Sequence, residues 1–231
     1  MLTVWLLCIT THFMGLCQSA NLNNLAWPQM RRTVDNLARS SFSTATIANN
    51  KQLANNLWHY PTEKGIFSTP ILSHDSKVAL VGSADNNFYA VKMFAFDTDP
   101  QNLLQWKFET DDIIDSAGAL LPFGTEGSYL VLIPSADGHI YAVNESDGSL
   151  RWSFKADNVK NSADANAGMH CKISGTPQGG LAAWFEGNVK VVQYDYYSQY
   201  GLQQTMIYAG CDDIRLYGLN STGQLQFSFY T

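Results

Sequence analysis

The densest group of chemically reactive side chains in this sequence is acidic and lies between residues 109 and 115. Its members are Glu109, Asp111, Asp112 and Asp115. Clustered carboxylates could bind a hard cation such as Ca²⁺, which prefers oxygen ligands. The same charges are also typical of a solvated loop between two strands. We favour the loop, so the sequence predicts no metal site.

Cysteine and histidine side chains are spaced too widely to predict a metal site either. No CxxC motif occurs, and His170 is the only histidine near Cys171 or Cys211 in the sequence. An oxidising compartment would permit a disulfide between Cys171 and Cys211. Two buried thiols are an equal alternative, because the sequence does not fix the Cα–Cα distance on which a disulfide depends.

Motifs of nucleophilic catalysis and phosphate binding are absent from the sequence. It contains no GxSxG elbow, no HExxH pair and no glycine-rich loop that ends in lysine. We therefore expect no catalytic residue. One local feature suits recognition instead, because four tyrosines fall between Tyr194 and Tyr200 and tyrosine is enriched at protein interfaces. An exposed hairpin within an insertion would explain the same cluster.

Composition excludes two broad classes of protein. The 14 basic and 20 acidic residues give a net charge of −6, so there is no positive excess to neutralise the phosphates of a nucleic acid. The 45% hydrophobic content excludes a disordered chain, which needs low hydrophobicity. Only 15% of the residues are charged, whereas 13% are aromatic. This balance predicts a folded domain with an aromatic-rich core.

The N-terminal segment has the pattern of an export signal. No Asp, Glu, Lys or Arg occurs before Arg31, and residues 2–16 are mostly apolar. That run is shorter than the roughly 20 apolar residues of a membrane-spanning helix, so we expect no stable membrane span. Small residues at 17–20 suit a cleavage site. The sequence predicts a signal peptide over residues 1–19 and a secreted or periplasmic protein, in which Asn144 and Asn220 would be glycosylated only by a host that glycosylates such sequons.

Two short sequence motifs recur along the chain, and their copies alternate regularly. The first ends in aromatic residues and is anchored by Trp58, Trp106, Trp152 and Phe227, at intervals of 48, 46 and 75 residues. The second carries an Asp four residues before a Tyr, at Asp85–Tyr89, Asp137–Tyr141 and Asp213–Tyr217. Periods of 20 to 50 residues indicate a repeat array or a propeller. The longer last interval predicts an insertion around residues 185–205.

The motifs predict strands joined by tight turns. Residues 77–82, 88–91, 129–133, 140–143 and 150–154 are rich in apolar and β-branched residues, and the turns at Asp85–Asn87 and Asp137–Gly138 separate them. Only residues 28–39 suggest a helix. The fold class is therefore all-β, a partial β-propeller of four-stranded antiparallel blades, with about three blades and an N-terminal lead strand. The lead segment would cover residues 20–56, and residues 57–231 would hold blades at about 61–108, 111–154 and 171–229.

The aromatic anchors have a structural role in this fold. A large aromatic on an outer strand can wedge against the next blade and bury about 200 Å². The small Ala90 and Ala142 would leave room for such a wedge. Phe227 lacks the indole N–H of the tryptophans, so any hydrogen bond made by that group is missing there. Propellers close with about four to eight blades, so three blades predict an incomplete ring.

The repeats resemble the PQQ-like family, the β-propellers related to quinoprotein dehydrogenases. Ala142, Gly148 and Trp152 match the tryptophan-docking pattern of that family, although Asn144 stands where the pattern has Asp. Gly218–Phe227 resembles a shortened copy, and Ala90–Trp106 a stretched one. The resemblance implies blade-docking residues, which are Trp58, Trp106, Trp152, Phe227, Ala90, Ala142, Gly148 and Gly223.

The resemblance implies a fold more firmly than an activity. The enzymes of this family hold PQQ with a metal ion at the propeller axis, many of them under a ring of adjacent cysteines, and this sequence has no adjacent cysteines. We therefore expect a non-catalytic, exported binding or scaffold module without a cofactor. Its partners would be a protein or additional blades, and open blade edges would permit self-association. The alternative is the N-terminal part of a PQQ-dependent dehydrogenase, with PQQ and calcium.

Overall fold

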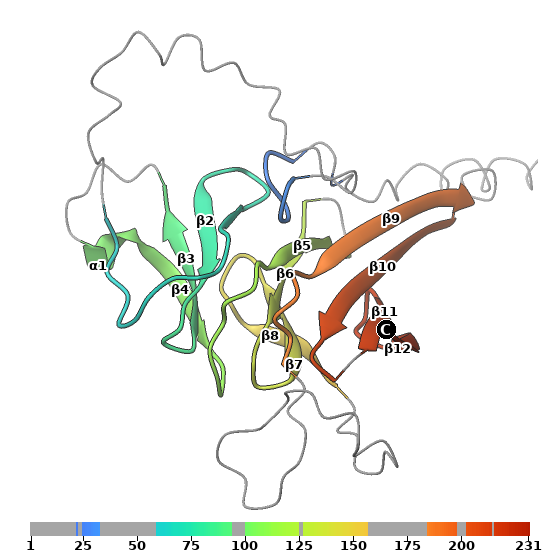
Figure 1. The fold of residues 1–231 in the computed structure, drawn as a ribbon. Coiled ribbons are helices and arrows are strands. Elements are labelled where there is room, and N and C mark those ends of the chain that lie inside the picture. The colour runs from blue at the N-terminus through green and yellow to red at the C-terminus, as the bar shows by residue number, and fades with distance from the viewer. Residues whose placement is uncertain are drawn as a thin grey trace, which may run out of the picture.

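The computed structural model describes residues 22, 25–32, 59–93, 100–124, 127–156, 184–197, 202–213 and 215–231 (Figure 1). The expected signal peptide, Trp58, Cys171 and most of the lead segment lie outside these residues. Within them, the chain forms three four-stranded antiparallel sheets, and each sheet consists of four consecutive strands. This architecture confirms the predicted all-β partial propeller.

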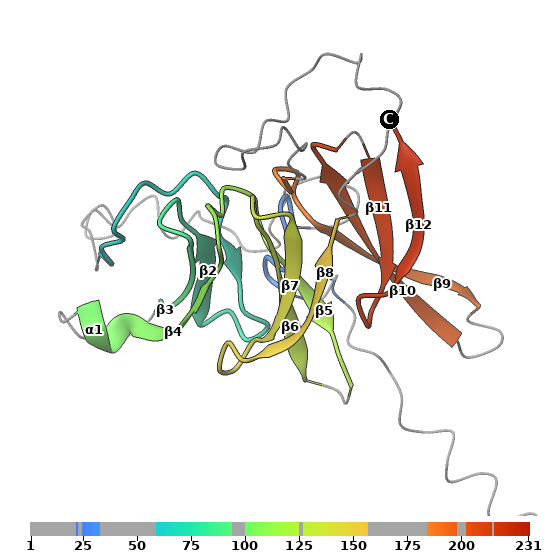
Figure 2. The same cartoon turned by 90° about the horizontal axis from the view of Figure 1, so that it is seen from below.

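The sheets follow one another along the chain, with the second lying between the first and the third (Figure 2). The first contains β1 (Ile71–Leu72), β2 (Val78–Gly82), β3 (Asn87–Lys92) and β4 (Leu104–Glu109). The second contains β5 (Ala119–Pro122), β6 (Tyr129–Pro134), β7 (His139–Asn144) and β8 (Leu150–Lys155). The third contains β9 (Lys190–Tyr197), β10 (Leu202–Cys211), β11 (Arg215–Asn220) and β12 (Leu225–Tyr230). One short helix, α1 (Pro100–Leu103), precedes β4.

The predicted turn chemistry is present in the hairpins between the middle strands. Asn86 and Gly138 have φ of 68° and 87°, a left-handed conformation that Asn and Gly adopt most readily. In the first of these turns Asp85 Oδ1 accepts a hydrogen bond from the Asn87 amide at 3.1 Å. The expected insertion around residues 185–205 is occupied largely by the long strands β9 and β10 (Figure 1).

The helix expected over residues 28–39 is wrong for its described part. Gln29 forms a β-bridge with Ala119, and Arg31 and Arg32 have positive φ values of 56° and 68°. The periodic spacing of apolar residues that suggested a helix is overridden here by pairing with a strand. Residues 33–39 lie outside the described part.

The N-terminal segment instead crosses the first strand of every sheet. The Leu72 amide of β1 donates to Trp27 O at 2.9 Å, and the Leu120 amide of β5 donates to Pro28 O at 2.7 Å. The Val191 amide of β9 donates to the side-chain Oε1 of Gln29 at 3.1 Å. This segment therefore satisfies backbone donors at the inner edges of all three sheets, which otherwise would expose unpaired strand groups.

The core lies between the sheets. Its largest fully buried side chains include Phe88 from the first sheet, Leu132 from the second, Phe185 before the third, and Tyr217 within the third. Burial of these faces is the main stabilising term, because each sheet alone would leave both faces in water. In the described part of the chain, no helix is long and apolar enough to cross a membrane.

Candidate functional site

The contact between the first and second sheets is built around Trp106 of β4. This residue is 7% exposed, and its Nε1 donates to the Glu145 carbonyl oxygen at 2.8 Å. The indole lies against Gly148, where a Cβ atom would come within 2.8 Å of the ring. Gly148 also has a φ of 72°, which disfavours any other residue. The turn after β7 therefore receives the tryptophan of the preceding sheet.

The second and third sheets repeat this contact in a weaker form. Trp152 of β8 lies against Gly223, where a Cβ atom would come within 2.5 Å of the indole. The buried Nε1 of Trp152 has no hydrogen-bond partner in the described part of the chain. The receiving turn is one residue shorter, since Asn220 N bonds Gln224 O whereas Asn144 N bonds Ser149 O. Among the described residues, no carbonyl of this shorter turn accepts a hydrogen bond from the Trp152 indole.

The small residues expected to leave room for the aromatics pair with them across neighbouring strands. Ala90 pairs with Trp106, and Ala142 pairs with Trp152. In the third sheet Gly218 pairs with Phe227, and a Cβ atom on Gly218 would lie 2.3 Å from the Phe227 ring. Phe227 therefore packs over its own sheet, and no further sheet of the described chain covers it.

A second inter-sheet element is the Asp–Tyr pair of each β-hairpin. The Tyr89 hydroxyl donates to Asp85 Oδ2 at 2.9 Å, and the Tyr141 hydroxyl donates to Asp137 Oδ2 at 2.8 Å. Tyr217 makes the same bond with Asp213. Burial tends to raise the pKa of Asp85, but hydrogen bonds from Tyr89, the Glu63 amide and Asn87 together lower it. Burial, and then the bond to the carboxylate, raise the pKa values of all three tyrosines.

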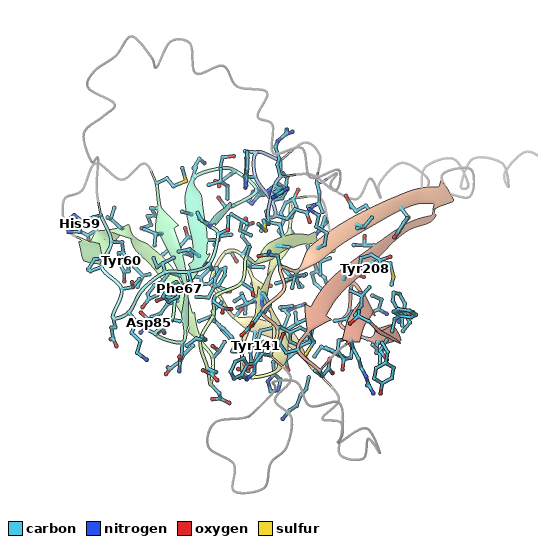
Figure 3. All side chains as sticks on the ribbon, in the orientation of Figure 1. His59, Tyr60, Phe67, Asp85, Tyr141 and Tyr208 are labelled. Carbon is cyan, nitrogen blue, oxygen red and sulfur yellow. The ribbon has the colours of Figure 1, made fainter. Side chains whose placement is uncertain are left out.

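Each of these tyrosines supports an aromatic ring from the part of the chain that precedes its sheet. Phe108 lies 5.2 Å from Tyr141, and Phe154 lies 5.4 Å from Tyr217, between ring centroids. Tyr60 occupies the same position on Tyr89 at 5.6 Å, close to Asp85 (Figure 3). The segment before the first sheet thus supplies the aromatic ring that β4 and β8 supply to the sheets that follow them.

Alkaline pH is expected to destabilise the chain through these tyrosines. The folded state raises the pKa of Tyr217 and Tyr89 above the value of about 10 in an unfolded chain. Their stabilising contribution is therefore complete below about pH 10 and is lost as the pH rises toward the folded value, by at most about 1.4 kcal/mol per pH unit for each tyrosine. Urea unfolding between about pH 8 and pH 11 measures the slope. A Tyr217→Phe variant should show a shallower slope, and an equal slope would contradict this origin.

The face of the third sheet that points away from the second sheet carries exposed aromatic side chains. Along β12, Leu225 is 42% exposed, Phe227 41% and Phe229 65%. On β9 and β10 of the same sheet, the hydroxyl oxygens of Tyr194 and Tyr208 lie 2.5 Å apart (Figure 3 labels Tyr208). Burial and this hydrogen bond raise the pKa of Tyr208 to about 12. Tyr194, from the tyrosine cluster noted in the sequence, therefore lies on this face.

In each of the first two sheets, one row of side chains crosses the face that contacts the following sheet, and the third sheet has a corresponding row on its outer face. The rows are Ile71–Leu80–Ala90–Trp106, Ala119–Leu132–Ala142–Trp152 and Lys190–Tyr208–Gly218–Phe227. The first two rows are apolar, and all their members except Trp152 are buried. The third row replaces two aliphatic positions by Lys190 and Tyr208. Its polar groups make this face amphipathic, as the surfaces of reversible protein interfaces are.

Other candidate residues from the sequence do not converge. No group of three or more His, Cys, Asp or Glu in the described part of the chain could hold a metal ion. Within the acidic group, Asp112 Oδ1 accepts a hydrogen bond from the Ile113 amide at 2.8 Å, and the Asp111 amide donates to Asp137 Oδ2 at 3.1 Å. Cys211 is partly buried, and its burial raises the thiol pKa. Its pairing with Cys171 remains a prediction, because Cys171 lies outside the described residues.

One polar contact was not predicted from the sequence. Glu145, in the turn that receives Trp106, is 8% exposed. Its carboxylate accepts hydrogen bonds from the His74 amide at 2.7 Å and contacts His74 Nδ1 at 2.5 Å. These groups border a polar cavity of about 350 Å³ between the first two sheets. Because the two residues are 71 positions apart, no local motif could have indicated the pair.

Comparisons with known proteins agree on the fold. No protein-family model matches the sequence, and a search of curated proteins finds no match. Among solved structures, the chain is similar to the quinohemoprotein alcohol dehydrogenase ADHIIG of Pseudomonas putida HK5, with a TM-score of 0.55, 19% identity, and 89% of this chain and 26% of that chain covered. A europium-containing methanol dehydrogenase is similar with a TM-score of 0.57 and 14% identity, and the match covers 91% of this chain and 33% of that chain. The quinohemoprotein alcohol dehydrogenase of Comamonas testosteroni is similar with a TM-score of 0.54 and 12% identity, and the match covers 89% of this chain and 27% of that chain.

These similarities establish architecture only. The chain spans about a quarter to a third of the length of the three solved structures. At this level of identity the shared feature is the arrangement of four-stranded sheets, not a set of site residues. The chain has a partial β-propeller fold like that of the PQQ-dependent quinoprotein dehydrogenases.

Proposed function

We propose that this chain is an exported, non-catalytic binding module that acts through protein–protein contact on the outer face of its third sheet, which no other sheet of the described residues covers. The observation that carries the proposal is the aromatic stripe of β12, which consists of Phe227 and Phe229. Equivalent stripes on β4 and β8 contact the following sheet, whereas Phe227 and Phe229 are 41% and 65% exposed. Exposed apolar patches with polar neighbours are typical of protein interaction sites. Export is supported by the signal-like pattern of residues 1–19.

Aromatic anchors on this face suit the energetics of a protein interface. Tyrosine and other large aromatic side chains supply most of the binding energy at many interfaces, because each buries a large area at a low entropy cost. Phe227, Phe229, Tyr194 and Tyr208 share this face, and Tyr208 also lies 6.1 Å from Phe227 between ring centroids. Hydroxyl groups beside these rings allow the face to remain hydrated when no partner is bound.

A second candidate function is part of a PQQ-dependent dehydrogenase, which the fold favours. Two observations on the described residues favour a module without that cofactor. PQQ is a polycarboxylate and calls for cationic and amide donors, yet Arg32 Nε donates to Ala26 O and Lys190 Nζ donates to Met30 O, both at 3.1 Å. The described part of the chain also contains no cluster of metal-binding side chains. We therefore derive no chemical step through PQQ.

Titration with the quinone separates the two candidates. Folded protein is incubated with equimolar PQQ and excess Ca²⁺, passed through a desalting column, and examined for quinone absorbance and for dye-coupled alcohol oxidation. The expected result is no retained quinone and no oxidation. Stoichiometric retention of PQQ would overturn the non-catalytic proposal.

Partner binding is tested with a matched surface variant. The chain and a Phe227→Ser/Phe229→Ser variant are immobilised separately and exposed to proteins secreted by the host. A partner that is then purified should bind the variant at least about tenfold more weakly, and the two forms should have the same circular dichroism. Equal affinity of a purified partner for both forms would show that this face is not the binding surface.

A further inference from the structure

We propose that two faces left without a neighbouring sheet among the described residues bind each other between copies of this chain. The outer face of the third sheet would bind the outer side of the first sheet in a second copy, with Ile66 of one copy beside Gly210 of the other. The proposal rests on the proposed function, because it uses the same face and names its partner. It follows from a contact between an entering residue and the preceding sheet that occurs twice within the chain, at Ile114 and at Phe185.

We use the term plug for the residue that lies before the first strand of a sheet and contacts the preceding sheet. The Ile114 amide donates to Ser83 O at 3.1 Å, and the Phe185 amide donates to Ser135 O at 3.3 Å. Both side chains are fully buried. These residues cross from one sheet to the next and attach to the same position of the preceding sheet, immediately after strands β2 and β6.

The socket for Ile114 is the space left by a glycine. A Cβ atom at Gly82 would lie 2.3 Å from Ile114 Cγ2 and 2.7 Å from Ile114 O. The isoleucine side chain therefore fills the volume that any other residue at position 82 would need. At the Phe185 contact the corresponding sheet residue is Pro134, so a glycine at this place is a feature that Gly82 shares with Gly210.

Ile66 is the equivalent plug of the first sheet. The carbonyl oxygen of the residue before each plug accepts a sheet amide at 3.0 Å, in the bonds Ala84 N to Gly65 O, Ala136 N to Ile113 O and Asp212 N to Trp184 O. Ile66 thus corresponds to Ile114 and Phe185. Those two residues are fully buried, whereas Ile66 is 46% exposed and its neighbour Phe67 is 75% exposed; Figure 3 labels Phe67 near the first sheet.

Gly210 is the equivalent socket on the third sheet. Gly82 pairs with Phe88 at the end of β2, and Gly210 pairs with Leu216 near the end of β10. A Cβ atom at Gly210 would meet nothing within 4 Å. In the described part of the chain, one copy therefore presents a plug without a socket and a socket without a plug, on opposite outer sheets. A second copy supplies both missing halves.

The aromatic stripe has a place in the same contact. Beside Ile66, the first sheet carries a cavity of about 240 Å³ with a mostly apolar lining that includes Pro70, Ala79, Val81 and Val91. Phe227 of the other copy would enter this cavity as Trp106 enters the second sheet. Phe229 would meet Tyr89, where Tyr60 already lies at 5.6 Å between ring centroids. Tyr60 therefore competes with Phe229 and weakens the contact.

Complementation between two variants provides the test. Ile66→Asp removes the plug and keeps the socket, whereas Gly210→Val fills the socket and keeps the plug. Sedimentation velocity over a concentration series should show that the wild-type chain associates and that each variant alone associates at least about tenfold more weakly. An equimolar mixture of the two variants should form a heterodimer, because one intact contact remains between them. A head-to-tail contact of this kind continues into rings or chains in the wild type.

A Tyr60→Ala variant tests the same contact by an expected gain of self-association. It should associate more tightly than the wild type, because the competitor of Phe229 is removed. A wild-type chain that stays monomeric over the whole series, or variants that fail to form the heterodimer when mixed, would overturn the inference. Loss of a different partner by the Phe227→Ser/Phe229→Ser variant would, in that case, still support the proposed function.

Discussion

Replacing Trp106 with alanine is expected to lower the free energy of unfolding by about 3–5 kcal/mol, the range observed when a buried tryptophan is truncated. The side chain is 7% exposed and lies against Gly148 of the second sheet. Its loss would open a cavity between the first two sheets and would leave the Glu145 carbonyl without its 2.8 Å donor. Urea unfolding followed by tryptophan fluorescence and circular dichroism measures the effect.

Phenylalanine substitutions separate the hydrogen bond from the packing in this prediction. Trp106→Phe removes both the indole area and the bond to Glu145 O, and it leaves that carbonyl unsatisfied. Trp152→Phe removes part of a side chain that is less buried than Trp106, and it removes no hydrogen bond, because Trp152 Nε1 has none in the described part of the chain. We expect Trp106→Phe to cost about 1–2 kcal/mol more than Trp152→Phe. Equal costs would show that the bond to Glu145 contributes nothing net.

Replacing Gly82 with alanine is expected to cost about 3 kcal/mol, at the upper end of the usual overpacking range. The added Cβ would lie 2.3 Å from Ile114 Cγ2 and 2.7 Å from the Ile114 carbonyl oxygen. Ile114 is fully buried and its amide is held by Ser83 O at 3.1 Å, so neither the side chain nor the backbone can move away cheaply. The same denaturation experiment measures the loss.

Gly210→Ala is the matched control for this substitution. Gly210 occupies the corresponding place on the third sheet, but nothing lies within 4 Å of a Cβ atom built there. Its substitution should change the stability of the monomer by less than about 0.5 kcal/mol. A large loss at Gly210, or a small one at Gly82, would contradict the socket geometry on which the head-to-tail contact depends.

Much of the fold was predictable because its determinants are local. Alternation of apolar residues, the Asp–Asn and Asp–Gly turns, and the spacing of Trp106 and Trp152 act over a few residues, and they specified the β-strands and their grouping into four-stranded sheets. The pairing of Ala90 with Trp106 also follows from the repeat, because each aromatic has a small residue at a fixed place in the preceding strand. The helix expected near residue 30 failed, since a bridge from Gln29 to Ala119 is a long-range contact.

The sequence by itself determined the strands, their turns and the positions of the aromatic anchors, because side-chain type and spacing specify these features locally. Only the tertiary structure decided which tryptophan finds a carbonyl, that His74 reaches Glu145, and that Ile66, Ile114 and Phe185 are equivalent. Ile66 and Ile114 share only the short pattern Ile-x-Ser, and Phe185 lacks it. Backbone amides attach Ile114 and Phe185 to the preceding sheet. Such bonds depend on how the sheets pack rather than on which residue makes them, and they decide which face is covered and which is open.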